Sequence, residues 1–244
     1  MNFYSVIIGT ELLNGRRVDK HFSFINEELT KRGLNHQASF VIKDKPELIK
    51  QTFAFIKQDP NAVMFSFGGI GATPDDLTRK IAAQVFTCKP LSLHVGAKEL
   101  IEKQFGAEAY PHRINMGMLP QDAKLLHNTI NNVPGFYLFE RYFFTPGFPS
   151  MAWPMITWTL DTLFASKAKP HTHSFIVDTG ESDLIDIMKS LPEKIELSSL
   201  PKMSAGKRQV EIYLAAYDKD LLEQCYSNFL LHVKQKGFTC KVLD

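Results

Sequence analysis

The sequence predicts an α/β domain with a mostly parallel sheet, followed by a small α+β domain. Two observations carry this prediction. The first 86 residues alternate between a short apolar strand and an amphipathic helix three times, which is typical of a parallel sheet with helices on its faces. The last 74 residues instead follow the order βαββαβ, which is typical of a small split α+β unit.

The three strand–helix units begin with buried strands at 4–8, 37–42 and 62–67. A helix over 20–32 carries one apolar face after the first strand. Asp44, with Glu47 three residues later, predicts the start of the second helix as a variant of the capping box. Thr73 predicts an N-cap for the third helix, because Pro74 suits the first helical position and Asp76 lies three residues after the cap.

The pattern is looser between residues 89 and 164. We expect a helix over 96–105 and three short strands, then a rigid turn at 146–149 and an apolar helix over 151–164 that Pro154 starts or kinks. The short strands are expected at 124–126, 136–138 and 142–145.

A small, polar segment that ends in proline, residues 165–170, is the expected domain boundary. We therefore expect one domain over residues 1–168 and a second over 169–244. The elements expected in the second are strands at 174–177, 195–197, 209–215 and 238–242 and helices at 182–191 and 219–236.

Composition restricts the class of partner. The 244 residues carry 28 Lys and Arg against 26 Asp and Glu, a net charge of +2, which is too small to indicate nucleic acid or an anionic membrane as the main partner. The three cysteines, Cys88, Cys225 and Cys240, form no CxxC pair, so neither a disulfide framework nor a zinc site is expected. No signal peptide or membrane span is recognisable, and we expect a cytoplasmic protein.

The most specific local signal is the glycine loop that follows the third strand, Gly68-Gly69-Ile70-Gly71. Backbone amides in such a loop, together with a helix N-terminus, form an anion site that most often binds phosphate. Asp75 and Asp76 would repel a phosphate unless a divalent cation bridges carboxylate and phosphate oxygens. The alternative is a glycine turn followed by acidic residues in a first helical turn, where they are common.

Acidic residues also follow the first two strands. Because the carboxyl ends of parallel strands meet at one edge, we expect Glu11, Asp44 and the Asp75–Asp76 pair to converge there. Asp19 flanks the first strand-to-helix turn. As alternatives, Asp44 serves only as a helix cap, and Glu11 and Asp19 are solvated loop residues.

Six segments, taken together, resemble the CinA family, whose N-terminal part is a molybdopterin-binding domain of the MoaB/MogA type. Their order and spacing match over residues 4–165, and the remainder is similar to the KH-type module that follows in CinA proteins. The matching segments are Gly9-Thr10-Glu11-Leu12-Leu13-Asn14-Gly15 with Asp19, Asp44, the stretch from Gly68 to Thr78, Asn115, Pro134-Gly135-Phe136, and Pro146-Gly147-Phe148-Pro149 with Met151.

The resemblance implies a three-layer α/β/α domain that binds a nucleotide or molybdopterin at the glycine-loop edge. It further implies hydrolysis of the pyrophosphate of ADP-ribose or a related nucleotide with a divalent metal (Mg, Mn, Co or Ni), and self-association into a homo-oligomer. In that scheme Asp44, Asp75 and Asp76 are catalytic, and Asp75 and Asp76 hold the metal. The implied ligand-binding residues are Gly9, Thr10, Glu11, Gly15, Asp19, Gly68, Gly69, Gly71, Thr73, Thr78, Asn115, Pro146 and Gly147.

Departures from the family pattern keep a second interpretation open. Ser150 stands where the family motif carries an acidic residue, and Asn131-Asn132-Val133 replaces Gly-Thr-Ala. A non-catalytic protein that binds molybdopterin or a related pterin phosphate is therefore the alternative to a pyrophosphatase.

The family's C-terminal amidohydrolase domain, which deamidates nicotinamide mononucleotide, has no counterpart in this sequence, so we expect that activity to be absent. RNA binding is not expected, because no Gly-x-x-Gly loop occurs between residues 171 and 244.

Overall fold

The computed structural model describes residues 1–204 and 206–243. The chain divides into two compact units, Met1–Lys167 and Ala168–Asp244. Each unit has a hydrophobic core of its own.

The first unit is built on a six-stranded sheet with the order β2-β1-β3-β8-β7-β6. Strands β2, β1, β3 and β8 are parallel, whereas β7 is antiparallel to both of its neighbours. The prediction of a mostly parallel sheet is therefore confirmed. A separate two-stranded ribbon is formed by β4 and β5.

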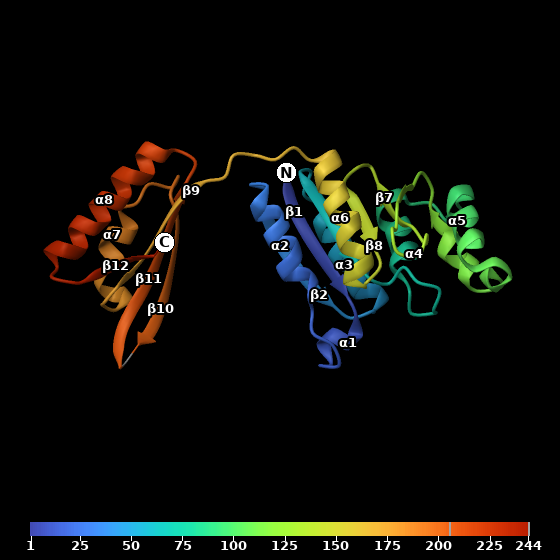
Figure 1. Cartoon of the computed structure of the whole chain (residues 1–244), viewed down its shortest axis with the longest axis horizontal. Helices are drawn as coiled ribbons and strands as arrows, with labels where there is room; N and C mark the ends of the chain where they lie inside the picture. Colours follow the sequence, from blue (N-terminus) through green and yellow to red (C-terminus); the bar gives the residue numbers. More distant parts are fainter. Residues whose placement is uncertain (205, 244) are drawn as a thin grey trace. The chain divides into compact units, whose positions relative to one another are not determined.

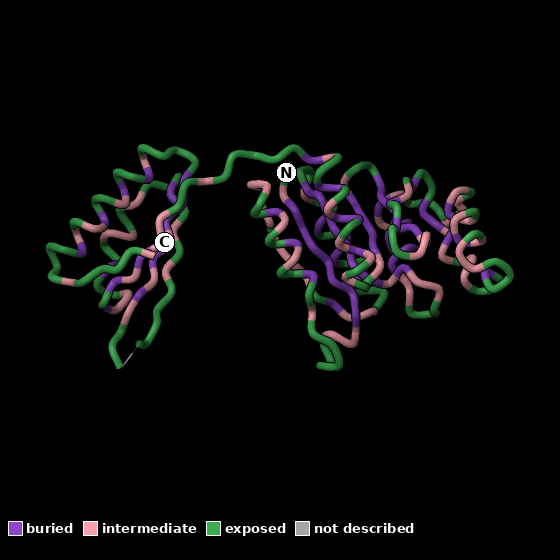
Figure 2. The backbone as a smooth tube through the Cα atoms, viewed as in Figure 1, coloured by how far each residue is buried: buried purple, intermediate pink, exposed green. Residues whose placement is uncertain are grey.

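Helices cover both faces of this sheet, so the unit has three layers (Figure 1). One face packs against α3 and α4 through side chains such as Phe53 and Ile81. The other packs against α2 and α6 through Ile25 and Ile156. The central strands are buried along their length, as Figure 2 shows, because apolar side chains point to both faces.

Most element positions in this unit agree with the sequence-based expectations. The strands are β1 (Asn2–Ile8), β2 (His36–Ile42), β3 (Ala62–Phe67), β4 (Leu91–Leu93), β5 (Met118–Pro120), β6 (Lys124–Leu126), β7 (Gly135–Leu138) and β8 (Tyr142–Thr145). The α-helices are α1 (Thr10–Leu13), α2 (His21–Lys31), α3 (Pro46–Lys57), α4 (Thr78–Ala82), α5 (Val95–Phe105) and α6 (Pro149–Leu163). The π- and 3₁₀-helical turns are η1 (Ala83–Thr87), η2 (Gly106–Ala109) and η3 (Arg113–Gly117).

Three predicted helix starts are wrong. Helix α4 begins at Thr78 rather than after Thr73, and the residue before α3 is Lys45, so Asp44 does not cap that helix. Helix α6 begins at Pro149, where the missing N–H of proline costs nothing, and continues through Pro154. In the first two cases the expected capping side chain bonds elsewhere: Thr73 to Asp76, and Asp44 to Thr10.

The second unit contains a four-stranded antiparallel sheet with the order β10-β11-β9-β12. Its elements follow the predicted βαββαβ order, although the first helix is shorter than expected and is preceded by a 3₁₀ turn. They are β9 (His171–Val177), η4 (Glu181–Asp183), α7 (Ile185–Lys189), β10 (Glu196–Ser204), β11 (Lys207–Ala216), α8 (Lys219–Gln235) and β12 (Cys240–Leu243). The relation of this unit to KH modules stays a prediction.

Within the described ranges, the structure contains no helix of the length and apolarity that crossing a membrane requires.

Candidate functional site

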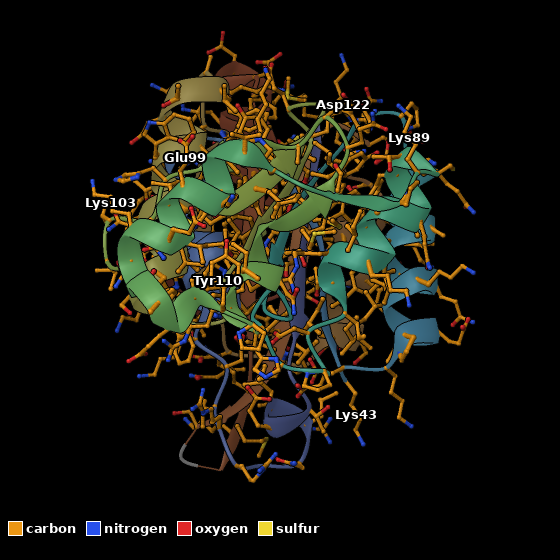
Figure 3. All side chains as sticks on the ribbon, turned by 90° about the vertical axis from the view of Figure 1, so that its right-hand side faces the viewer. Lys43, Lys89, Glu99, Lys103, Tyr110 and Asp122 are labelled. Atoms are coloured by element: carbon orange, nitrogen blue, oxygen red, sulfur yellow. The ribbon has the colours of Figure 1, made fainter. Side chains whose placement is uncertain are left out.

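The candidate site lies at the carboxyl edge of the parallel strands. Strands β1, β2, β3 and β8 end at Ile8, Ile42, Phe67 and Thr145, and the loop after each strand begins at this edge. Figure 3 shows Lys43, which directly follows β2, at the same lower edge of the domain as α1, with Lys89 and Asp122 at the opposite end. Ligands of open α/β sheets bind in the crevice outside this edge.

A cavity of about 470 Å³ opens between these loops. That volume falls within the range of small-molecule sites. The structure brings together here eleven residues that the sequence singled out: Gly9, Glu11, Asp44, Gly68, Gly69, Gly71, Thr73, Asp75, Asp76, Pro146 and Gly147.

The glycine loop needs glycine because it lies against neighbouring backbone. Gly68 and Gly69 have φ values of 98° and 68°, which L side chains rarely adopt. A Cβ atom on Gly68 would lie 2.4 Å from the carbonyl oxygen of Ile8, and one on Gly69 would lie 2.3 Å from the Thr78 hydroxyl oxygen. These glycines therefore allow the loop to pack onto the end of β1 and onto α4.

Four consecutive amides of this loop are free. The N–H groups of Gly69, Ile70, Gly71 and Ala72 have no hydrogen-bond acceptor among the residues that the structure describes, and all four residues line the cavity. The flanking amides differ, since Gly68 N–H donates to Thr145 O at 2.9 Å and Thr73 N–H donates to Asp76 Oδ2 at 2.8 Å. A run of unpaired backbone donors is suited to binding an anion.

The loop closes on α4 through backbone contacts rather than through a helix N-cap at Thr73. The Thr78 amide donates to Gly69 O and the Thr78 hydroxyl donates to Gly68 O, each at 3.0 Å. Both groups of Thr78 are therefore occupied, and Thr78 is buried and does not line the cavity.

Arg79 lies buried beneath the loop. Its Nη1 donates to Ile70 O, whereas its Nε is buried without a partner in the described structure. Burial lowers the pKa of Arg79 to about 10, although the nearby Asp76 opposes that effect. The guanidinium is therefore still charged at neutral pH, and it binds the Ile70 carbonyl of the loop.

The two aspartates after the loop have different environments. Asp76 Oδ2 accepts hydrogen bonds from the amide and hydroxyl of Thr73, at 2.8 and 2.6 Å, in a tight turn. This turn explains why the Thr73–Asp76 spacing does not mark a helix start. The pKa of the exposed Asp75 carboxyl is lowered by the nearby Thr73 side chain and by its own amide, although the Thr73 hydroxyl proton is donated to Asp76, and Asp75 is ionised at neutral pH.

Asp44 binds the loop of the neighbouring strand. Its Oδ2 accepts from the Thr10 amide at 2.6 Å and from the Thr10 hydroxyl at 2.8 Å. The Asp44 amide donates back to the same hydroxyl at 3.2 Å. Asp44 thus joins the ends of β1 and β2. Glu11, which directly follows Thr10, lines the cavity.

Five predicted ligand-binding residues lie outside the cavity lining: Thr10, Gly15, Asp19, Thr78 and Asn115. Asn115 is exposed on η3, and its neighbour Met116 lines the cavity instead. Asp19 lies in a second, adjacent cavity of about 320 Å³ and accepts hydrogen bonds from the His21 and Phe22 amides at the start of α2.

His21 is a buried side chain that lines the second cavity. Its ring stacks on Phe67 with 4.3 Å between centroids, and its Nε2 lies 3.2 Å from the Gly147 carbonyl oxygen. A carbonyl can only accept, so Nε2 carries the proton, and the buried Nδ1 has no partner in the described structure. Burial lowers the pKa of His21, with opposing contributions from Gly147 and Asp19.

Sequence reasoning did not assign a site role to several lining residues. These are Ile8, Arg17, Ile70, Ala72, Phe105, Met116, Asn128, Asn131, Val133, Phe148 and Met151. Phe105 and Asn128 come from distant segments whose packing no local motif reveals. Phe148 and Met151, in contrast, belong to a motif that had been singled out.

The side chains do not form a metal site by themselves. Among the residues described, no group of three or more His, Cys, Asp or Glu side chains is placed to hold a metal ion. Asp75 and Asp76 therefore lack a third protein ligand, and the Asp76 and Asp44 carboxylates already accept hydrogen bonds from Thr73 and Thr10.

Comparison with known proteins agrees with this architecture. Residues 5–165 match the family model described as "Probable molybdopterin binding domain". A CinA-like protein of Synechocystis is 33% identical over 133 residues, which cover 53% of this chain and 32% of that protein. A CinA-like protein of Flavobacterium psychrophilum is 26% identical over 232 residues, 89% of this chain and 55% of that protein.

Among solved structures, the protein CinA from Thermoplasma acidophilum, whose function is described as unknown, aligns with a TM-score of 0.60 at 25% identity, covering 66% of this chain and 98% of that one. The fold and the family match thus define a molybdopterin-binding-type α/β domain. The chain belongs to the CinA-like family that carries this domain. It spans about a third to about a half of the length of the two curated relatives described.

Proposed function

We propose that the chain binds a small planar heterocycle that carries phosphate, either molybdopterin or a nucleotide such as ADP-ribose, in the 470 Å³ cavity. The observation that carries this proposal is the run of four unpaired amides, Gly69 to Ala72, in the cavity wall. Phosphoryl oxygens are the acceptors that such a run suits. Membership of the molybdopterin-binding-domain family supports a pterin ligand.

Binding is favoured over catalysis because of how the carboxylates are used. Asp44 and Asp76 each accept two hydrogen bonds within the chain, and the described residues form no metal cluster. Both residues thus have a structural role in holding the loops that shape the cavity, which accounts for their positions without a catalytic role.

Hydrolysis of the ADP-ribose pyrophosphate is the second candidate. The exposed Asp75, whose carboxyl pKa is lowered, favours it because an ionised carboxylate lies next to the free amides. Magnesium is commonly held by one or two carboxylates together with substrate phosphates, so any cation here depends on the ligand's own oxygens.

The test is isothermal titration calorimetry with molybdopterin and with ADP-ribose, alongside phosphorus NMR of ADP-ribose with Mg, Mn, Co or Ni. Saturable binding without turnover supports the binding function. Turnover with any of these metals establishes the pyrophosphatase, and failure of both ligands to bind contradicts the proposal. Light scattering on the same samples tests the expected homo-oligomer.

A further inference from the structure

Acidic side chains outnumber basic ones in the lining of the cavity, although the expected ligand is itself an anion. Four carboxylates line it, those of Glu11, Asp44, Asp75 and Asp76. Among the described lining residues, Arg17 is the only basic one. A phosphate bound at the loop amides therefore needs positive partners to offset these acids. Arg79 lies buried beneath the loop, and Arg17 lines the cavity itself.

Arg17 is not engaged by any of these acids. The ion pairs found in the described part of the chain all involve other residues, and no side-chain hydrogen bond there includes Arg17. Its backbone is nevertheless fixed, because the Arg17 amide donates to Glu11 O at 3.1 Å. The exposed guanidinium is thus held at the cavity mouth with all its donors available.

Phe148 lies beside Arg17 in the cavity lining. The Arg17 Cζ is 5.8 Å from the centroid of the Phe148 ring, and both residues line the cavity. Phe148 directly precedes α6 and is 53% exposed, so its ring is accessible to a ligand. A cation–π contact at an exposed position is weak, so a ligand can replace it.

Resting on the proposed function, we infer that Arg17 and Phe148 form a clamp that selects ligands with both a phosphate and a planar ring. The Arg17 guanidinium binds phosphoryl oxygens opposite the amides of Gly69 to Ala72, and the Phe148 ring stacks on the heterocycle. Guanidinium groups bind phosphate through paired hydrogen bonds, and aromatic side chains stack on any base or pterin.

The test separates the two halves of the ligand. Calorimetry is run on the full chain with ADP-ribose, molybdopterin, inorganic pyrophosphate and adenosine, using the variants R17Q and F148L. We expect R17Q to weaken ADP-ribose and pyrophosphate by about tenfold or more and to leave adenosine unchanged. We expect F148L to weaken ADP-ribose and adenosine by about fivefold and to leave pyrophosphate unchanged. The molybdopterin titrations show whether the same clamp holds a pterin.

Matched controls are available next to each position. Arg16 is exposed, bonds to Asn14 and does not line the cavity, so R16Q keeps wild-type affinity. Phe139 is 59% exposed after β7, outside the cavity lining, so F139L does the same. Wild-type affinity in R17Q and F148L overturns the clamp while the proposed function stands. If the wild type binds none of the four compounds, the proposed function fails first.

Discussion

At the scale of single residues, two features of the first unit can be tested directly: the backbone freedom of Gly69 in the site and the burial of His21 in the adjacent cavity. Gly69 combines a positive φ of 68° with a neighbour, the Thr78 hydroxyl, that leaves no space for a Cβ atom. His21 combines burial, an Nε2–H donated to Gly147 O and an unpartnered Nδ1. Each of these two residues has a control of the same residue type elsewhere in the first unit: Gly15 for Gly69, and His112 for His21.

Gly69→Ala is expected to destabilise the first unit by more than about 2 kcal/mol, since backbone strain and a steric clash act together. Gly15→Ala is the control, because Gly15 also has a positive φ, 77°, but nothing lies within 4 Å of the added Cβ. It should cost only about 1 kcal/mol. Urea unfolding measures both, and equal losses would show that the loop tolerates a side chain at Gly69.

The buried His21 predicts a pH-dependent stability. Its pKa is lowered in the folded state, so protonation favours the unfolded chain. The stabilising contribution is complete above about pH 6.5, the ordinary histidine value, and is lost as the pH falls below it towards the folded-state pKa. His21→Asn should therefore reduce the drop in unfolding free energy between pH 7.5 and 5.

The matched control for that experiment is His112→Asn, because His112 is exposed in the same unit. A His112→Asn variant with the wild-type pH profile, beside a flattened profile in His21→Asn, is the expected pair of results. Identical profiles in both variants would assign the pH dependence to other groups.

At the scale of secondary structure elements, the loops were harder to predict than the strands. Continuous apolar runs such as Tyr4–Ile8 predicted strands buried on both faces, and parallel order followed from the alternation with helices. The Thr73–Asp76 spacing, however, fits a tight turn as well as a helix start. Which one forms depends on the Thr78 amide, which binds Gly69 O across the loop, and no local pattern contains that information.

Asp44 illustrates the same limit. Its hydrogen bonds go to Thr10, 34 residues away, although the local sequence satisfies a capping pattern. Convergence at the strand ends could be inferred from topology, and the cavity does collect Glu11, Asp44, Asp75 and Asp76. The contributions of Phe105 and Asn128 could not, because their positions depend on how distant segments pack.

The Thr10–Asp44 contact predicts energetic coupling between the loops after β1 and β2. In a double-mutant cycle of Thr10→Val and Asp44→Ala, we expect a coupling energy of about 1 kcal/mol in unfolding free energy. A cycle that pairs Asp44→Ala with Thr30→Val, an exposed residue of α2 that does not contact Asp44 through a side-chain hydrogen bond, should give a value near zero. Additive effects in the first cycle would mean that the two loops are held independently.

At the scale of the whole molecule, the two units have separate cores, and the cavity is lined entirely by the first. A chain cut after Lys167 should therefore unfold cooperatively and bind the ligand with the affinity of the full chain. Thermal unfolding and calorimetry on residues 1–167 check this. Loss of binding in a folded fragment would show that the second unit contributes to the site.

The most direct test of the central claim is to follow the backbone amides of the glycine loop by ¹H–¹⁵N NMR while ADP-ribose or molybdopterin is added. We expect large shifts for the free amides of Gly69, Ile70, Gly71 and Ala72, and small shifts for Gly68 and Thr78, whose amides already donate within the chain. Saturable shifts elsewhere in the protein, with the four loop amides unchanged, would contradict the account.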